Sequence, residues 1–490
     1  MNTPPEYHDP AELAAAEILT WLSSTRPTSA EPGELLRLLQ LLDSAPLPAE
    51  AQQRFLDLLY SQALRLATNL TGSLSSQALP LPRPLRQRTR QTASLLALLA
   101  ETYARNPASP ATPAATRPHH LWQALQASLW QLRTDQQSAA PSEPGTWLRI
   151  HALYRRAREQ GIHQHPGPRR TASIEALYLQ LVLAAIAQPT SFSPDEIGFI
   201  GDYLAQSLPL PELTQHPGQA RTTFWIDPDK DLPAQALVRR NPPPETAILY
   251  LDCQTLAARI GEHCQQLQQG STAEQLGLPP QAPGFPLPAT LRRLQQLWGE
   301  PARRRFPRRR QSYRASLLSG LDTLCQLARD DTTSPPGSHW MVINESPDGY
   351  ALMHVSGDSS SIRVGDVVAI RPQRDATSDR SHWQPCLIRW VVSDNPEHLE
   401  IGLQVLAPQM QAAEIAGLPQ ATPALFLPEK PPLRPQAGLV VAAGSLPGQP
   451  ERLLLLVEQG NLCIREVRPT RLDDQTASVE IFSVEPDHSR

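Results

Sequence analysis

The sequence predicts an α+β multidomain protein in which an all-α helical region precedes a C-terminal antiparallel β-barrel. Two periodicities carry this prediction. Apolar residues recur every three or four positions from residue 10 to about 210, as in helices, and at every second position from about residue 338 onward, as in half-buried strands. The 490 residues also leave room for roughly three domains of about 150 residues each.

Four regions are expected along the chain. A helical region at 1–215, serving as a partner-binding part or scaffold, is followed by a mixed connecting segment at 216–300. A barrel with an arginine arm would occupy 301–430, and additional strands at 431–490 would extend the barrel domain. Fifty-two prolines, about twice the average share, cluster between apolar segments. Because proline ends helices and stiffens connections, we expect short elements with rigid links.

The first 210 residues contain about seven or eight helical patterns, of which ELLRLLQLLD and SIEALYLQLVLAAIAQ are typical. The strongest start signal is SPDEIGFIGDYLAQSL. Ser193 can cap this helix, Pro194 suits its first turn, and Glu196 completes a capping box. Short linkers join the patterns, but no fixed repeat period is present. A helical array of the kind that binds other proteins and a globular helical bundle therefore both remain open.

The connecting segment mixes both kinds of pattern. TTFWIDP, ALVRR and AILYLDC resemble short strands, whereas TLAARIGEHCQQLQQG and ATLRRLQQLWG resemble helices. Further on, the clearest strand is HLEIGLQV, in which Leu399, Ile401, Leu403 and Val405 alternate with more polar neighbours. GLVVAAG, RLLLLVE, LCIREVRP and ASVEIFSVEP add four strand-like runs after residue 430. Many short strands with frequent turn residues indicate a barrel or a sandwich.

Composition excludes several functional classes. A net charge of −4 gives the whole molecule no preference for nucleic acid or for an anionic membrane. No run approaches the ~18 apolar residues of a membrane-spanning helix, and the N-terminus lacks the features of a signal peptide. Five scattered cysteines form no disulfide framework, which suits a reducing compartment. We therefore expect a soluble, cytoplasmic protein without membrane insertion.

Three candidate sites are weak on inspection. DPDKD at Asp227 resembles the start of a calcium loop, but Leu232 and Val238 stand where glycine and glutamate are needed. His163 and His165 lack a third metal ligand nearby. The helix that carries Glu-His-Cys at 262–264 spreads these side chains over different faces. No phosphate-binding or dinucleotide-binding loop and no nucleophile elbow is present, so no enzyme and no cofactor is expected.

The arginine run RRRFPRRRQSYR, at 303–314, holds seven arginines in twelve residues without an interleaved acid. Such a run is either solvated or meets anions. Guanidinium groups match phosphates and the O6/N7 edge of guanine with two parallel hydrogen bonds. A solvated basic linker and a nucleic-acid patch are the alternatives, although only Phe306 and Tyr313 are available for base stacking.

A second unusual stretch follows in HWMVINESPDGYALMHV. Two strand-like runs are joined here by about six residues, Asn344 to Gly349, that are rich in small acceptors and turn formers. A simple hairpin needs only two. Arg310 and Arg314 have the spacing R-x-x-x-R, and Asn344, Ser346 and Gly349 have the spacing N-x-S-x-x-G.

This pair of motifs resembles the PilZ domain, a six-stranded antiparallel barrel that binds cyclic di-GMP. In that family R-x-x-x-R lies on an arm before the first strand, and (D/N)-x-S-x-x-G lies on the barrel. The later strands also fit, with Gly365, Asp366, Trp390 and Gly402 at matching positions. The resemblance covers roughly residues 303–408. The run allows other registers as well, with Arg304 and Arg308 or with Arg305 and Arg309.

The resemblance implies a bacterial signalling protein whose ligand is cyclic di-GMP. Two arginines on a flexible arm would close over the dinucleotide, and the long loop would line the pocket. The implied ligand-binding residues are Arg310, Arg314, Asn344, Ser346 and Gly349. Ligand binding would then be relayed to a protein partner of the helical region. The alternatives are a structural adaptor with a degenerate barrel that binds no nucleotide, and a nucleic-acid-binding protein.

Overall fold

The structure is a computed structural model. It describes residues 9–23, 31–75, 77–105, 117–218, 221–244, 247–301, 306–330, 337–359, 362–373, 382–395, 398–416, 422–429, 431, 434–446, 452–459 and 461–486. The chain divides into two compact units. The first consists of residues 1–76, 81–187 and 200–256, and the second of residues 77–80, 188–199 and 257–490.

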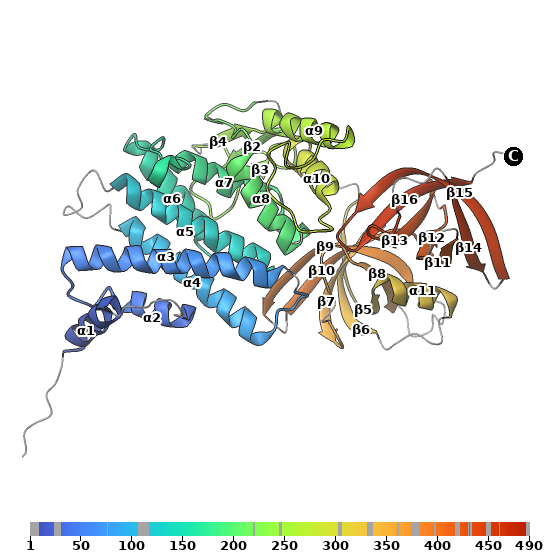
Figure 1. Ribbon diagram of the computed structural model, residues 1–490, viewed down its shortest axis with the longest axis horizontal. Coiled ribbons are helices and arrows are strands. Elements are labelled where there is room, and N and C mark those ends of the chain that lie inside the picture. Colours follow the sequence, from blue (N-terminus) through green and yellow to red (C-terminus); the bar gives the residue numbers. More distant parts are fainter. Residues whose placement is uncertain are drawn as a thin grey trace, which may run out of the picture. The chain divides into compact units, whose positions relative to one another are not determined.

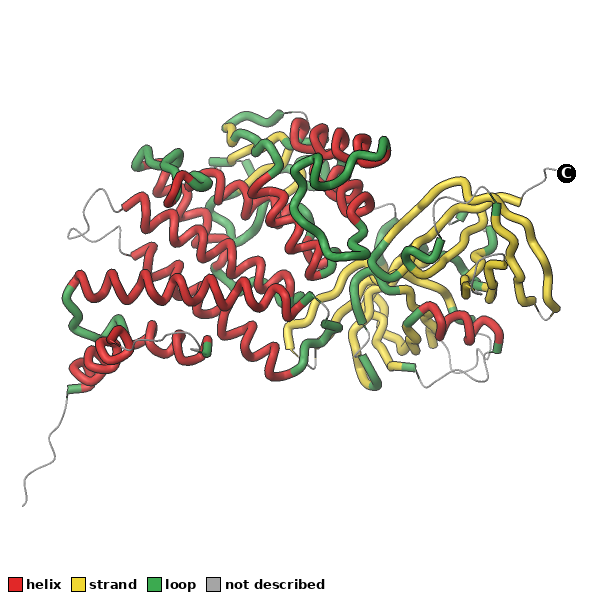
Figure 2. Tube along the Cα trace, viewed as in Figure 1, coloured by secondary structure: helices red, strands yellow, loops and turns green. Residues whose placement is uncertain are grey.

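The described part of the chain holds eight α-helices between residues 10 and 206, which confirms the helical prediction (Figures 1 and 2). They are α1 (Pro10–Ser23), α2 (Pro32–Leu41), α3 (Ala49–Leu74), α4 (Arg83–Arg105), α5 (Arg117–Gln137), α6 (Thr146–Glu159), α7 (Ile174–Ile186) and α8 (Pro194–Gln206). Short 3-10 turns, η2 (Pro168–Arg170) and η3 (Pro189–Ser191), lie between the last of them. Helices α4 and α5 pack along each other, and α5 also packs on α7. Tyr103 and Tyr178 are fully buried in this core.

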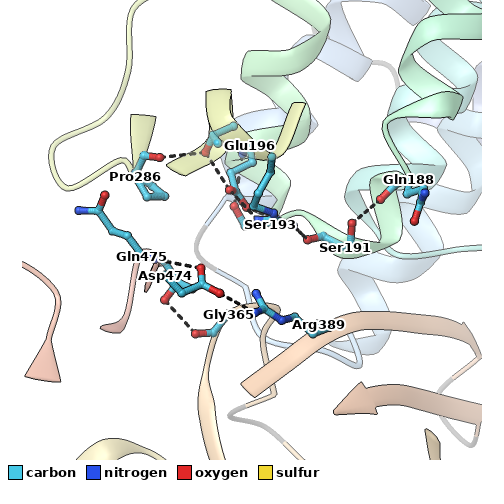
Figure 3. Close-up of polar contacts among 12 residues, drawn as sticks. Gln188, Ser191, Ser193, Glu196, Pro286, Gly365, Arg389, Asp474 and Gln475 are labelled. Carbon is cyan, nitrogen blue, oxygen red and sulfur yellow. Dashed lines mark hydrogen bonds and ion pairs between the residues drawn. The ribbon is translucent and has the colours of Figure 1, made fainter. Parts of the chain in front are cut away.

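The predicted capping box of α8 is present. The backbone N–H of Glu196 donates to Ser193 Oγ at 3.3 Å, and the N–H of Ser193 donates to Glu196 Oε2 at 2.8 Å. The other carboxylate oxygen of Glu196 accepts from Thr290 Oγ1 at 2.9 Å and from Arg293 at 3.3 Å (Figure 3). A local capping signal has thus become part of a tertiary polar cluster.

A small antiparallel sheet follows the helices. Its strands are β1 (Leu213–Thr214), β2 (Thr223–Ile226), β3 (Gln235–Ala236) and β4 (Leu249–Asp252), in the order β1-β4-β2-β3. The DPDKD stretch leaves β2. Its last carboxylate, Asp231, accepts from the backbone N–H groups of Gly145, Trp147 and Leu148 at the start of α6. This acid therefore caps a helix from a distant segment.

Replacing Asp231 by alanine should lower the free energy of unfolding by about 1 kcal/mol, the usual value of a lost N-cap. Burial raises the pKa of Asp231, but the three N–H donors outweigh burial and the pKa is lowered. The cap therefore stabilises the fold at pH values above the pKa of Asp231. This stabilisation should be lost as the pH falls through that lowered pKa. Urea unfolding at neutral and acidic pH measures this. Asp229→Ala is the control, because Asp229 makes an exposed ion pair with Arg155; equal losses in both variants would contradict the cap.

Two helices, α9 (Gln254–Gln268) and α10 (Leu287–Gly299), precede the first barrel. That barrel consists of β5 (Arg309–Ser319), β6 (Ser338–Ser346), β7 (Gly349–Ser356), β8 (Val367–Gln373), β9 (Gln384–Asn395) and β10 (His398–Val405), with α11 (Leu321–Arg329) between β5 and β6. The ring closes in the order β10-β7-β6-β5-β8-β9. All six pairings are antiparallel. The expected antiparallel barrel is present.

The last strands form a second closed barrel. They are β11 (Gln411–Ala416), β12 (Thr422–Leu427), β13 (Ala437–Ala442), β14 (Leu453–Gln459), β15 (Asn461–Gln475) and β16 (Val479–Pro486). The expected boundary at residue 430 is wrong, because β11 and β12 pair only with strands of this barrel. The expectation that residues 431–490 extend the first barrel is wrong for the same reason: their strands close their own ring.

Both barrels follow one pairing scheme. In each, the first strand pairs with the second and fourth, the third with the second and sixth, and the fifth with the fourth and sixth. Every pairing is antiparallel in both rings. The second barrel is therefore a topological copy of the first.

One apolar cluster spans both barrels and α11. It includes Leu318 and Leu387 of the first barrel, Leu324 of α11, and Leu425 and Ile481 of the second. Polar contacts surround it. Thr476 Oγ1 donates to the carbonyl of Gly365 at 2.9 Å, and Ser478 Oγ donates to Asp366 Oδ1 at 2.5 Å. The Gly365-Asp366 pair of the first barrel thus holds the turn between β15 and β16 of the second.

Candidate PilZ ligand site

The arginine pair lies on the first strand of the first barrel. Arg310 and Arg314 both belong to β5, and both side chains are exposed. The expected flexible arm is therefore wrong at these two positions, because backbone pairing with β6 and β8 holds this part of the run in the sheet. Arg304 and Arg305, on which the alternative registers depend, lie outside the described residues.

The second motif forms a tight hairpin. Strand β6 runs to Ser346 and β7 begins at Gly349, so only Pro347 and Asp348 make the turn. The expected loop of about six residues is wrong. Ser346 Oγ donates to Asp348 Oδ1 at 2.6 Å, which fixes the turn from inside the motif. The hydroxyl and carboxylate both remain half-buried at the rim of the barrel.

Gly349 allows two strands to approach closely. A Cβ on this residue would fall far inside van der Waals contact with the carbonyl oxygen of Leu403 on β10. That oxygen belongs to backbone within the sheet, so it cannot turn away as a flexible side chain could. The glycine is therefore needed for the approach of β7 to β10.

Strand register brings the two motifs together. Arg310 lies directly opposite Asn344, Asn344 is paired with Ala351, Ala351 with Gly402, and Gly402 with Trp390. Directly paired residues have Cβ atoms about 4.5–5.5 Å apart and point to the same face of a sheet. One row across five strands therefore contains the first motif arginine, the motif asparagine and a tryptophan.

The indole of Trp390 lies over Gly402. A Cβ on Gly402 would overlap the ring nitrogen and two ring carbons. Only a glycine can leave this space, so the aromatic ring is held flat against β10.

The neighbouring row runs from Arg314 to Met341, Met353 and Glu400. The barrel face thus combines a basic edge with apolar and aromatic surface.

Both motif arginines are open to an anion. Within the part of the chain that the structure describes, neither Arg310 nor Arg314 has an ion-pair or side-chain hydrogen-bond partner. The nearby acid Glu345 accepts instead from Tyr313 Oη at 2.5 Å and from Gln311 Nε2 at 3.1 Å. Two exposed guanidinium groups beside a hydrogen-bonding asparagine suit a phosphate or the O6/N7 edge of a guanine.

The described residues contain no group of three or more His, Cys, Asp or Glu side chains that could hold a metal ion. Among the helices that the structure describes, none is long and apolar enough to cross a bilayer.

The first barrel has the six antiparallel strands of a PilZ domain, and two family models identify the class of protein as a receptor with such a domain. Residues 13–218 match the N-terminal domain of the cyclic-di-GMP receptor FimW, and residues 325–412 match the middle PilZ domain of the same receptor. The chain belongs to the FimW family of cyclic-di-GMP receptors, a family of receptors and not of enzymes. No curated protein matches the chain. The PilZ match includes Asn344, Ser346 and Gly349 but begins after Arg314.

Sequence reasoning placed Trp390 and Gly402 on matching strands but did not assign them to the site. The signal was a glycine inside an otherwise alternating strand, which marks close approach of another group. Arg389 and Gln404 were missed altogether. The register between β7 and β10 places Gln404 opposite Gly349, and a hydrogen bond joins Arg389 to Gln404.

Proposed function

We propose that this chain binds cyclic di-GMP on the outer face of the first barrel. Arg310 and Arg314 would hold the dinucleotide, together with Asn344, Ser346 and Gly349. The observation that supports this most is the direct pairing of Arg310 with Asn344, since it joins the two motifs in one row. Arginine forks suit guanine edges and phosphates, and Asn344 supplies both a donor and an acceptor.

The roles within the site would differ. Gly349 keeps the hairpin close to β10, and Ser346 fixes the turn, so these two residues would shape the site more than contact the ligand. Trp390 offers a flat ring in the same row, and stacking of a base on an aromatic ring is worth about 1–3 kcal/mol. Because the arginines lie on a strand, the ligand would find them already partly ordered.

We further propose that the helical region at 1–215 is the output part, which binds a protein partner when the barrel is occupied. The segment at 216–300 would connect it to the barrels. All five cysteines are free, which suits work in the cytoplasm. A ligand can shift the output only by its differential affinity for two states of the protein.

Calorimetric titration of the full chain tests the proposal. Cyclic di-GMP should bind with a measurable heat, and GTP, which offers guanine and phosphate without the cyclic dinucleotide, should bind far more weakly. If a folded chain gives no heat of binding with cyclic di-GMP at about 100 µM ligand, the receptor function is contradicted for this chain. That result would favour a structural adaptor whose barrel binds no nucleotide. Salt-sensitive binding of any nucleic acid would favour the basic-patch alternative.

A further inference from the structure

A third arginine, Arg389, lies beside the motif hairpin and is held by the second barrel. Its Nε donates to Gln404 Oε1 at 2.5 Å. Its Nη2 donates to Asp474 Oδ2 at 2.5 Å (Figure 3). Gln404 belongs to β10 of the first barrel and Asp474 to β15 of the second. The guanidinium therefore bridges the two barrels.

The position of Arg389 follows from a bulge. On β9, Trp390 pairs with Gly402 and Ile388 with Leu403, which leaves Arg389 as the extra residue between two consecutive pairs. A bulge re-aims the side chain that it carries. Here it directs the guanidinium toward Gln404 instead of leaving it in the regular alternation of the strand.

Gln404 connects Arg389 with the candidate site. In the ladder between β10 and β7, Gln404 lies directly opposite Gly349, the last residue of the second motif. The next residue in the chain, Trp390, lies over Gly402 in the row of Arg310 and Asn344. Arg389 thus stands at one end of the proposed ligand face, and the β5 arginines stand at the other.

Asp474 is placed to compete for this arginine. Its side chain is 17% exposed and that of Arg389 is 33% exposed, so the pair is partly shielded from water. The neighbouring acid, Asp473, accepts from Ser483 and pairs with Arg471 and Arg434 in its own barrel. The two adjacent carboxylates therefore have different partners, and of these two only Asp474 contacts a side chain of the first barrel.

Asp474 also lies within electrostatic range of Arg293 of α10. Burial lowers the pKa of Arg293 most, while Glu196 and Asp474 raise it and Arg389 lowers it further. Two arginines consequently share the field of one carboxylate. When Arg389 leaves Asp474, Arg293 remains near this carboxylate. The negative charge of Asp474 therefore keeps a positive charge close to it.

We propose that Arg389 is a third arginine for the dinucleotide, and that Asp474 competes with a ligand phosphate for it. This inference rests on the proposed function. When a phosphate arrives beside Gly349, the guanidinium leaves Asp474 and the polar contact between the barrels opens. Ligand binding and the barrel junction are then thermodynamically coupled, so weakening one must strengthen the other.

A double-mutant cycle on the full chain tests the competition, with cyclic di-GMP affinity as the readout. Asp474→Asn frees Arg389 and should tighten binding by about 3- to 10-fold, toward the lower part of the usual coupling range. Arg389→Gln should weaken it by about 10-fold or more, as for loss of a charged contact. In the double variant, Asp474→Asn should have no further effect, because its only route to the ligand is gone.

Matched controls separate this from general charge effects. Glu466→Gln removes one negative charge from the same strand, at an exposed pair with Arg452. Arg371→Gln removes one positive charge from the first barrel, where Arg371 lies over Trp383. Neither should change affinity more than about 2-fold, because neither residue belongs to the row of the motif residues or to the pair of Arg389 with Asp474. Thermal unfolding of every variant verifies that it is folded. The double variant leaves neither partner of this ion pair alone, so it still measures the contribution of Arg389 to binding where Arg389→Gln by itself unfolds.

The outcomes are distinct. Unchanged or weaker binding in Asp474→Asn, with binding by the wild-type chain, overturns the competition and leaves the proposed function intact. Equal tightening by Asp474→Asn with and without Arg389 also overturns it, because the acid would then act through its charge alone. Absence of binding by the folded wild-type chain overturns the proposed function and this inference together.

Discussion

Alanine at Arg310 or at Arg314 should each weaken cyclic di-GMP binding by about 5- to 150-fold. Loss of one bidentate guanine contact costs roughly 1–3 kcal/mol, and about 1.4 kcal/mol corresponds to tenfold in affinity. Both side chains are exposed on β5, and Arg310 is paired with the motif asparagine. Calorimetry at low and high salt measures the loss, which should persist at high salt because the contacts are directional.

The controls come from the same run. Arg309→Ala changes the residue just before Arg310, which points to the other face of the strand and lies opposite Glu345. Arg303→Ala and Arg304→Ala remove charges farther upstream. Each should cost well under 1 kcal/mol, and salt should erase the effect. A shallow, equal loss at all positions would mean a diffuse basic patch. A steep loss at Arg304 or at Arg309, in place of Arg310 and Arg314, would move the register within the family.

Alanine at Gly349 should destabilise the first barrel by about 1–3 kcal/mol and abolish high-affinity binding. The new methyl group would collide with the backbone carbonyl of Leu403, so β7 and β10 must separate where the motif hairpin begins. Forced overpacking of this kind typically costs that much. Urea unfolding measures the stability, and calorimetry of the folded variant measures the binding.

Gly72→Ala is the matched control. Gly72 lies within α3, and a Cβ there meets nothing within 4 Å. Since alanine is favoured over glycine in a helix by about 1 kcal/mol, this variant should be as stable as the wild-type chain or more stable. Wild-type stability in Gly349→Ala would show that the two strands adjust freely, and the steric role of the glycine would fail.

Periodicity predicted the elements that depend on local physics. The apolar spacing gave the helices between residues 10 and 206, and the Ser193–Glu196 capping box formed as expected. Alternation gave β10, in which Leu399, Ile401 and Leu403 are buried. Such signals work because each element buries the face that its own sequence marks as apolar.

The motif hairpin shows where local signals fail. Asn344 and Ser346 have low strand propensity, so the sequence indicated a long loop. In the barrel, β6 is paired on both sides, with β5 and β7, and these ladders extend the strand through Ser346. Tertiary hydrogen bonding overrides propensity at this point. The arginines of β5 were likewise expected on an arm outside the barrel. They fit on the strand because its first half is exposed to solvent.

Residues that act across the barrels could not be found from spacing. Arg389 and Asp474 are far apart in the sequence, and each depends on a register irregularity in its own strand. The closure of the second ring likewise depends on the pairing of β13 with β16 and of β11 with β14. No window of local pattern contains both partners of such a pair.

The repeated pairing scheme has a consequence for the order of folding. The first hairpin of the second barrel is closed by residues 417–421, whereas the equivalent strands of the first barrel are separated by residues 320–337, which include α11. Each doubling of a loop costs roughly 0.6 kcal/mol of closure entropy, so the longer connection costs about 1 kcal/mol more. The C-terminal ring can therefore nucleate more readily than the ring before it.

During synthesis, however, β5 to β10 emerge before the second barrel exists. The apolar cluster that the two barrels share with α11 is then still uncovered. Strand exchange between the two similar barrels is therefore the misfolding error to expect.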